Sequence, residues 1–419
     1  MLNETTAKTA AEKISGAELL SAIRAASARI QGSIWCSPCQ HSAALSAACG
    51  QKVHLKLENL QMTGSYKERG ALNKILLLTP EQRSNGVIAA SAGNHAQAVA
   101  YHAGRLGIRA TIVMPSITPL VKVTATQSYG AEVVLDGANY DDACKHALSL
   151  AAERKMTFLH PFDDFEVIAG QGTIGLEILE QVPEIEAAVI PVGGGGLIAG
   201  VACALKEQRP NIKIIGVQTA RLPSMVEARK KGVPVIVPAA STVADGIAVR
   251  RSGDNTLPLV LRYVDDMVTV EEEEIASAIL TLLEREKTLA EGAGAAATAA
   301  LLQHKTGLPK GQRTVSIVGG GNIDVSLLSR IIERGLVKDG RLVRVRIHLP
   351  DRPGALVELS TVIAAQRANI VELKFDRAYY GVSLGDTAID VTLETRGAQH
   401  LAELMAAIAR SGYTHERIL

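Results

Sequence analysis

Short apolar runs alternate with longer amphipathic segments along most of the chain, which is the pattern of β-strands followed by α-helices. The expected strands are 53–58, 87–91, 109–114, 131–135, 187–192, 213–218, 267–270 and 313–318. The expected helices are 17–30, 66–78, 94–106, 119–129, 141–155, 165–181, one from 197, 271–287 and 292–303. Repeated strand–helix units predict parallel sheets covered by helices. We therefore expect an α/β fold with two lobes, with ligands at the carboxyl ends of the strands.

The pattern changes after Gly340. Apolar residues then alternate with Arg344, Arg346 and His348, as in a half-buried strand, and a turn follows at 351–354. The next expected elements are a helix, two strands, a helix and a strand, at 355–367, 369–377, 387–394, 398–410 and 413–418. This order predicts a ferredoxin-like βαββαβ domain of about 80 residues.

A chain of 419 residues is long enough for two or three domains. We place the main boundary near 338–341. The expected parts are a flexible N-terminal tail at 1–15, a larger α/β domain at 16–337 and a C-terminal domain at 341–419. A smaller lobe at about 53–160 is expected to be inserted in the larger lobe of the α/β domain.

The charge balance argues for a small-molecule partner. A formal net charge of +1 disfavours nucleic acid and anionic membranes as partners. The first 15 residues lack the apolar core of a secretory signal, so we expect a cytoplasmic protein. The uncharged stretch 187–205 is long enough to raise the question of a membrane span. Pro191 and the four glycines at 193–196 divide it into a strand and a helix start, so we reject that interpretation.

The cysteine pattern fits a reducing compartment, because five cysteines form no regular disulfide framework. Cys36-Ser37-Pro38-Cys39 has the spacing of a thioredoxin-type redox motif, which requires a preceding strand. The preceding segment 17–30 is expected to be a helix, so an ordinary turn is favoured over redox chemistry.

Lys67 is the first candidate for chemistry. It lies between Gly64 and Gly70, where the expected strand 53–58 leads into the helix 66–78. An amine at such a junction is held by rigid elements and remains accessible to a ligand. A lysine in the first turn of a helix is more often a solvated charge, so other motifs must support this interpretation.

Two glycine-rich or polar turns provide that support. Gly193, Gly194, Gly195 and Gly196 follow a strand and open a helix at Leu197, which predicts a phosphate site built from backbone N–H groups and a helix N-terminus. Four consecutive glycines exceed the requirement of a tight turn. A dinucleotide site is disfavoured, because the next strand ends in Gln218-Thr219 without an acidic residue.

The second turn contains Ser91, Ala92, Gly93, Asn94 and His95, whose polar groups suit a carboxylate or a ring oxygen. The alternative role for Ser91 or Asn94 is to cap the helix, and an isolated histidine is more often structural than catalytic. A reactive lysine, a phosphate site and a carboxylate site together predict pyridoxal 5'-phosphate and an amino-acid substrate. Lys67 must then be neutral when it attacks, so its pKa must lie below the ordinary value of ~10.4.

The joint motifs 65–71, 91–95 and 193–197 resemble the fold-type II pyridoxal-phosphate enzymes, and within them the threonine dehydratases (threonine ammonia-lyases), over about 15–335. The resemblance implies that Lys67 holds the cofactor, that Asn94 binds its ring hydroxyl and that 193–197 bind its phosphate. It assigns the substrate to Ser65 and to the turn Ser91, Ala92, Gly93, Asn94 and His95.

Three positions depart from relatives of this kind. Gly319, in the turn Gly319-Gly320-Gly321-Asn322, stands where the family usually has serine or cysteine beside the pyridine nitrogen, so that partner is missing or replaced by water. Ala92 stands where serine racemases have a basic serine, which favours elimination over racemisation. The strand ending in Gln218 lacks the carboxylates that bind a metal in those racemases, so no metal site is expected.

The segment 351–356 resembles an ACT domain, a module that binds amino acids and regulates many enzymes. This implies allosteric control by an amino-acid effector, with Asp351 and Gly354 as candidate ligands. The whole resemblance implies deamination of L-threonine to 2-oxobutanoate and ammonia, with activity on L-serine, in isoleucine biosynthesis, by a homo-oligomer (dimer or tetramer). Two alternatives stay open: a dehydratase of serine or 3-hydroxyaspartate, and a non-catalytic amino-acid-binding regulator.

Overall fold

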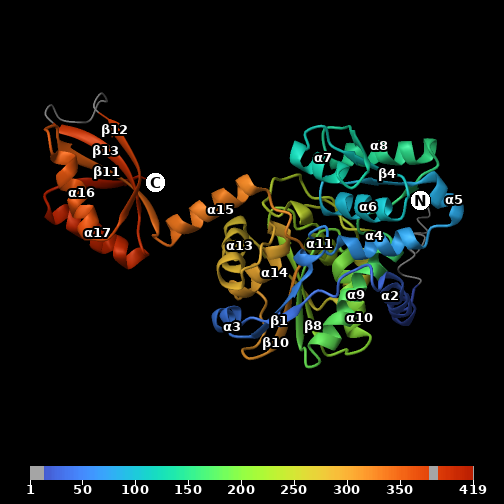
Figure 1. Ribbon diagram of the computed structural model, residues 1–419. Helices are drawn as coiled ribbons and strands as arrows, with labels where there is room; N and C mark the ends of the chain where they lie inside the picture. Colours follow the sequence, from blue (N-terminus) through green and yellow to red (C-terminus); the bar gives the residue numbers. More distant parts are fainter. Residues whose placement is uncertain (1–13, 377–385, 419) are drawn as a thin grey trace, which may run out of the picture. The chain divides into compact units, whose positions relative to one another are not determined.

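The computed structural model describes residues 14–376 and 386–418 (Figure 1). The chain divides between Ile323 and Asp324 into two compact units, which are considered separately. Most of the expected tail, residues 1–13, and the expected end of a strand at Arg377 lie outside the described residues. The predicted α/β class and the C-terminal βαββαβ order are both confirmed.

The larger sheet of the N-terminal unit has the strand order β1-β2-β10-β7-β8-β9. Its strands are β1 (Cys39–His41), β2 (Lys52–Leu57), β7 (Ala187–Pro191), β8 (Lys213–Thr219), β9 (Asp266–Val270) and β10 (Arg313–Val318). The edge strand β1 is antiparallel to β2, and the other neighbours are parallel. β7 is buried along its whole length, as expected for a central parallel strand covered on both faces.

The smaller sheet is parallel throughout, in the order β5-β4-β3-β6. Its strands are β3 (Val87–Ala90), β4 (Ala110–Met114), β5 (Glu132–Leu135) and β6 (Thr157–Phe158). The expected start of the smaller lobe at about residue 53 is wrong for β2. That strand pairs with β10 from Lys52 to Leu57 and therefore belongs to the larger sheet.

Helices cover both sheets. Those before or within the smaller lobe are α2 (Gly16–Ile30), α3 (Ala43–Cys49), α4 (Lys67–Leu76), α5 (Pro80–Asn85), α6 (Asn94–Arg105), α7 (Leu120–Gln127) and α8 (Tyr140–Glu153). The later ones are α9 (Phe165–Gln181), α10 (Gly196–Lys206), α11 (Ser224–Lys231), α12 (Thr256–Tyr263), α13 (Glu272–Glu286) and α14 (Gly292–Leu302), with single 3₁₀ turns η1 (Glu58–Leu60) and η2 (Asp245–Ile247). α6 and α8 contact β4 of the smaller sheet (Figure 1).

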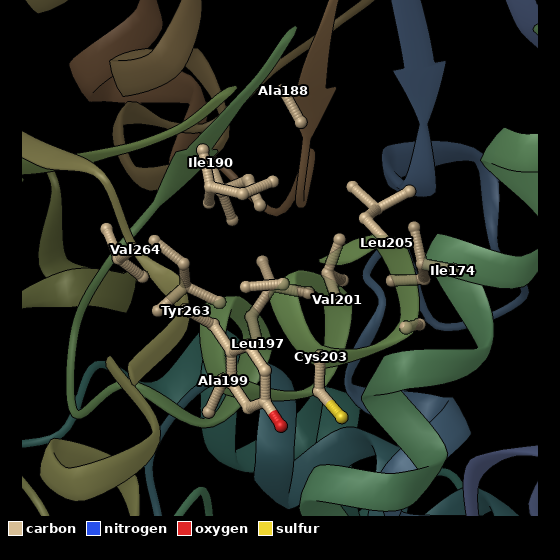
Figure 2. Close-up of a cluster of buried hydrophobic side chains, with 14 of the residues drawn as sticks. Ile174, Ala188, Ile190, Leu197, Ala199, Val201, Cys203, Leu205, Tyr263 and Val264 are labelled. Carbon is tan, nitrogen blue, oxygen red and sulfur yellow. The ribbon is translucent and has the colours of Figure 1, made fainter. Parts of the chain in front are cut away.

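The largest apolar core fixes the start of α10. Leu197, Val201 and Leu205 recur at four-residue spacing and face the buried residues Ala188 and Ile190 of β7 (Figure 2). All five are in one cluster of buried side chains. Because α10 begins at the glycine-rich turn, this packing anchors the turn to the sheet. The stretch 187–205, rejected above as a membrane span, is thus a strand and a helix.

Close contact between α4 and α9 positions the lysine-bearing helix. A Cβ on Gly170 of α9 would lie 2.6 Å from the Cα of Gly70 in α4 and 2.6 Å from the backbone oxygen of Arg69. Only glycines at both positions allow the two backbones to approach so closely. α4 therefore has little freedom to slide along α9.

The C-terminal unit contains α15 (Val325–Lys338), β11 (Leu342–Pro350), α16 (Ala355–Ala365), β12 (Asn369–Asp376), β13 (Asp386–Glu394), α17 (Ala398–Arg410) and β14 (His415–Ile418). Its sheet is antiparallel, in the order β12-β13-β11-β14. Val343, Val345, Ile347 and Leu349 of β11 are buried in a core of their own, as their alternation predicts.

The structure also bears on a membrane span and on redox chemistry at Cys36 and Cys39, both disfavoured by the sequence. Within the described ranges, no helix has both the length and the apolar character needed to cross a membrane. All five cysteines are free, and a helix, α2, precedes the pair Cys36 and Cys39. Burial raises the pKa of Cys39 to about 12, which disfavours the reactive thiolate.

Candidate active site

Lys67 is the first residue of α4, and its side chain is partly buried. Its Nζ donates a hydrogen bond to the backbone oxygen of Pro161 at 2.8 Å and lies 5.4 Å from the centre of the Tyr66 ring. Burial lowers the pKa of Lys67 to about 8, and the nearby carboxyl of Glu291 opposes this shift. The amine is thus closer to its neutral, nucleophilic state at neutral pH than an exposed lysine.

Pro161 and Phe162 connect Lys67 to the glycine-rich turn. A Cβ on Gly196 would lie 2.7 Å from the backbone oxygen of Phe162, and one on Gly194 would overlap the Phe162 ring. Phe162 directly follows Pro161, whose oxygen holds the Lys67 amine. The predicted lysine and the predicted phosphate site therefore lie around one segment.

The turn has the geometry of an anion site. Gly195 has a φ of +101°, a backbone conformation that residues with a side chain rarely adopt. A Cβ at this position would also lie 2.8 Å from Thr256 Oγ1. Thr256 instead donates to the backbone oxygen of Gly194 at 2.6 Å, which holds that carbonyl away from the opening. Within the described residues, the backbone N–H groups from Gly193 to Leu197 donate no hydrogen bond. These N–H groups and the start of α10 are therefore available to a phosphate.

A second set of N–H groups lies at the start of α6. Gly93 precedes the helix, and its own N–H donates to Ser91 Oγ at 3.2 Å. The first intrahelical bond from this turn is donated by Gln97 to Gly93, so the N–H groups of Asn94 and His95 have no acceptor in the described part of the chain. Ala92 follows Ser91 and contributes no polar side-chain atom. The turn can bind a carboxylate through backbone N–H groups and the Ser91 hydroxyl.

The His95 side chain is directed away from this role. Its Nε2 lies 2.9 Å from the backbone oxygen of Leu159, and the ring is buried. Burial lowers the pKa of His95 to about 3, with the charge of Lys67 adding to the shift. The ring is therefore neutral and structural, and only the backbone of His95 faces the turn.

Asn94 is joined to two side chains from distant parts of the sequence. Its Nδ2 donates to Glu291 Oε1 at 2.7 Å, and its Oδ1 accepts from Asn322 Nδ2 at 2.8 Å. Burial raises the pKa of Glu291 to about 7, and Asp245 adds to the shift. Neither Glu291 nor a role for Asn322 was inferred from the sequence, because isolated polar residues beside a glycine-rich segment give no pattern of their own.

Ser65 and Gly319 complete the predicted set. Ser65 forms an antiparallel bridge with Gly320, and its buried Oγ has no hydrogen-bond partner among the described residues. The backbone oxygen of Gly319 accepts from the Tyr66 N–H at 3.1 Å. A Cβ on Gly319 would lie 3.3 Å from the Tyr66 ring, so this position borders the lysine motif.

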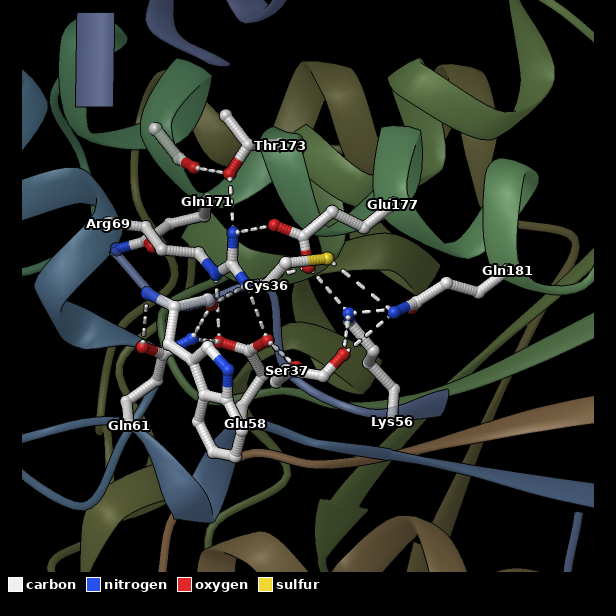
Figure 3. Close-up of polar contacts among 12 residues, drawn as sticks. Cys36, Ser37, Lys56, Glu58, Gln61, Arg69, Gln171, Thr173, Glu177 and Gln181 are labelled. Carbon is white, nitrogen blue, oxygen red and sulfur yellow. Dashed lines mark hydrogen bonds and ion pairs between the residues drawn. The ribbon is translucent and has the colours of Figure 1, made fainter. Parts of the chain in front are cut away.

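A buried network of charges lies behind the lysine motif (Figure 3). Arg69 donates from Nη2 to Glu58 Oε1 at 2.7 Å and from Nη1 to Glu177 Oε1 at 2.6 Å. Lys56 donates to Glu177 Oε2 at 2.5 Å and to the Ser37 backbone oxygen at 2.7 Å. Burial is the largest single effect and would raise the pKa of Glu58, but the charge and hydrogen bonds of Arg69, the charge of Lys56 and the Ser37 hydroxyl together lower it. The network ties α4 and β2 to α9 two residues beyond Lys67.

No metal site is evident in the described parts of the chain, where no three His, Cys, Asp or Glu side chains are grouped to hold an ion. Gln218, near the end of β8, accepts from the N–H groups of Met225 and Val226, each at 2.9 Å. This side chain caps the start of α11.

The candidate effector residues are in the C-terminal unit. Asp351 and Gly354 are both exposed in the turn between β11 and α16. Gly354 precedes α16 with a φ of +88°, and the space around its Cα is open. The turn can therefore approach a small ligand closely.

The fold and this site define a class of enzyme. Residues 30–320 match the family described as pyridoxal-phosphate dependent enzyme, and residues 339–413 match the ACT domain. The chain belongs to the pyridoxal-phosphate dependent enzyme family and carries a C-terminal ACT domain.

Particular relatives narrow the class. The chain is 49% identical to an L-threonine ammonia-lyase of Thermotoga maritima over 89% of this chain and 92% of that protein. The solved threonine deaminase isoform 2 of Solanum lycopersicum is 38% identical with a TM-score of 0.72, covering 80% of this chain and 96% of that one. Maize serine racemase is 35% identical with a TM-score of 0.72, covering 76% of this chain and 98% of that one.

The residues present fit pyridoxal phosphate. The turn 193–196 forms a cradle that a Cβ would fill, its N–H groups lack acceptors in the described residues, and the buried Ser65 Oγ lacks a partner there. Lys67 would hold the aldehyde, Asn94 the ring oxygen and the turn the phosphate. When bound, the cofactor supplies an electron sink that stabilises negative charge at the substrate Cα.

Proposed function

We propose that the protein deaminates L-threonine to 2-oxobutanoate and ammonia, and acts on L-serine as well. The observation that carries the proposal is the position of Lys67, a partly buried amine whose partner Pro161 adjoins the phosphate cradle. The matches to an L-threonine ammonia-lyase and to a threonine deaminase supply the substrate class. A non-catalytic binding protein would have no use for an amine with a depressed pKa.

Each group at the site has a separate role in the reaction. The N–H groups at the start of α6 and the Ser91 hydroxyl hold the substrate carboxylate, which orients the Cα–H bond toward Lys67. The free amine of Lys67 takes the Cα proton as a general base. Ala92 offers no acid or base on the opposite side, so loss of the β-hydroxyl, which takes up a proton and leaves as water, is favoured over return of a proton with inverted configuration. The released enamine takes up a proton, and water hydrolyses it to the 2-oxo acid and ammonia.

We extend the proposal to the setting of the enzyme. The ACT domain supports allosteric control by an amino acid, with Asp351 and Gly354 near the effector. The product 2-oxobutanoate fits isoleucine biosynthesis. Five free cysteines fit the cytoplasm, where thiols are kept reduced. A homo-oligomer is the usual state for such enzymes.

The test is release of 2-oxo acid by purified protein supplied with pyridoxal phosphate, from L-threonine and from L-serine. We expect release from both, faster from L-threonine, and none above background from Lys67→Ala. An active Lys67→Ala protein, or a wild-type protein that binds the cofactor but turns over neither amino acid, would contradict the proposal.

A further inference from the structure

Glu291 is a buried carboxyl in the site that the mechanism above does not use. It directly precedes α14 and has 5% of its surface exposed. Its backbone N–H donates to the Gly320 oxygen at 3.0 Å, and a Cβ on Gly320 would lie 2.5 Å from Glu291 Oε1. The absence of a side chain at Gly320 thus makes room for this carboxyl, which contacts the amide of Asn94.

The hydrogen bonds fix which way the Asn94 amide points. Asn322 Nδ2 donates to the backbone oxygen of Thr63 at 2.7 Å, and a carbonyl can only accept, so this atom of Asn322 is the amide nitrogen. The same Nδ2 faces Asn94 at 2.8 Å, which must therefore present its oxygen. The Asn94 nitrogen is then directed to Glu291. An amide nitrogen carries two protons, and within the described residues one of them is left without an acceptor.

The ionisable groups around Glu291 come from three elements. Lys67 is the first residue of α4, and Tyr66 directly precedes it. Lys122 is on α7, and Asp245 is on η2. Lys122 forms an ion pair with Asp245 at 2.7 Å, which partly offsets both charges. Among the described residues, Lys67 is the other cation that acts on Glu291. A negative charge on Glu291 stabilises a protonated nitrogen at Lys67.

We propose that Glu291 is a positioning residue: together with Asn322 it clamps the Asn94 amide so that one N–H points at the cofactor's ring oxygen. Because the charge of Glu291 acts on the Lys67 nitrogen, the pH dependence of the bound cofactor reports whether the carboxyl is in place. This inference rests on the proposed function, because it requires pyridoxal phosphate at Lys67.

The experiment uses the full chain and follows the absorbance of the bound cofactor instead of turnover. Glu291→Ala removes the acceptor for Asn94, and we expect the dissociation constant for pyridoxal phosphate to rise roughly five- to tenfold, as for one lost hydrogen bond. Asn322→Ala releases the other end of the amide, and we expect a similar loss. The double variant should lose less than the product of the two effects, because both act through Asn94.

Glu291→Gln separates charge from hydrogen bonding. Its amide oxygen can still accept from Asn94, so the cofactor affinity should stay close to that of the wild type. The negative charge is lost, so the pH midpoint of the absorbance change of the bound cofactor should fall. Glu272→Gln is the control. Glu272 accepts from the Val243 N–H at 2.7 Å in the segment that leads to Asp245 but forms no hydrogen bond with Asn94 in the described structure, and both readouts should stay unchanged.

Unchanged cofactor affinity in Glu291→Ala and Asn322→Ala, with an unchanged pH midpoint in Glu291→Gln, would overturn the inference even if the variants were less stable. Should Glu291→Ala fail to fold, the other two variants decide by the same criteria. A wild-type protein without a cofactor band would instead contradict the proposed function, and this inference with it.

Discussion

At Lys67, burial and a neighbouring carboxyl act on one amine in opposite directions. Burial favours the neutral form and brings the pKa to about 8, although Glu291 favours the charged form. A neutral amine is needed to attack an aldehyde or to accept a proton from carbon. From the residues alone, only the requirement that the pKa of Lys67 be lowered could be inferred. The structure supplies the cause, which is the enclosure of Nζ beside Pro161.

Single residues also mark the limit of sequence reasoning. Lys67, Asn94 and the turn 193–196 could be predicted, because each belongs to a motif at a strand–helix junction. Glu291 could not, since it contacts Asn94 across 197 positions and is flanked by small residues that carry no signal. The resemblance assigns His95 to the substrate, whereas its ring nitrogen Nε2 lies within hydrogen-bond distance of the Leu159 backbone oxygen. Its assignment as a substrate ligand through the backbone stays a prediction.

At position 319 this chain has glycine where the resemblance predicts serine or cysteine. A serine there would have its Cβ 3.3 Å from the Tyr66 ring, so the site lies beside the lysine motif in both cases. Glycine offers no hydroxyl to a pyridine nitrogen. We keep the prediction that water or no group replaces the usual partner.

At the scale of elements, the alternation of strands and helices predicted most of the fold but not which sheet receives β2. Its pairing with β10 joins residues about 260 positions apart, from Lys52 with Arg313 to Leu57 with Val318, which no local pattern reveals. For the same reason the sequence does not show what surrounds the polar side chains of β2. Lys56 on that face is fully buried, and its charge is paired with Glu177 of α9.

The ion network behind α4 gives a prediction for stability. Arg69→Met should lower the free energy of unfolding by roughly 3–5 kcal/mol, because Glu58 and Glu177 would keep buried negative charge with fewer partners. Urea unfolding measures the change. The matched control is Arg154→Met, whose ion pair with Glu132 is exposed and should contribute less than about 1 kcal/mol. Equal effects in the two variants would contradict a structural role for the network.

At the scale of the molecule, the two units have separate cores and separate candidate sites. Maize serine racemase matches only part of this chain, because 98% of its length corresponds to 76% of the length here. The ferredoxin-like unit could be predicted from alternation and turn residues alone. Its effector could not, because side-chain specificity depends on residues that folding brings together.

Truncation after Lys338 tests regulation by the C-terminal domain. We expect the full chain to change its rate on L-threonine when isoleucine or valine is added, and the truncated chain to keep activity but lose this response. Asp351→Ala in the full chain should require more effector for the same change. A truncated protein that responds to these amino acids as the full chain does would rule out the regulatory role.

The central claim is that Lys67 is the buried amine that captures the cofactor. The most direct measurement mixes cofactor-free protein with pyridoxal phosphate over a series of pH values, reduces the product with borohydride and locates the added mass by peptide mapping. The account predicts the label on Lys67, with a capture rate that rises through a midpoint near the pKa of about 8. A label on another lysine, or a rate that keeps rising toward the ordinary lysine value of ~10.4, would contradict it.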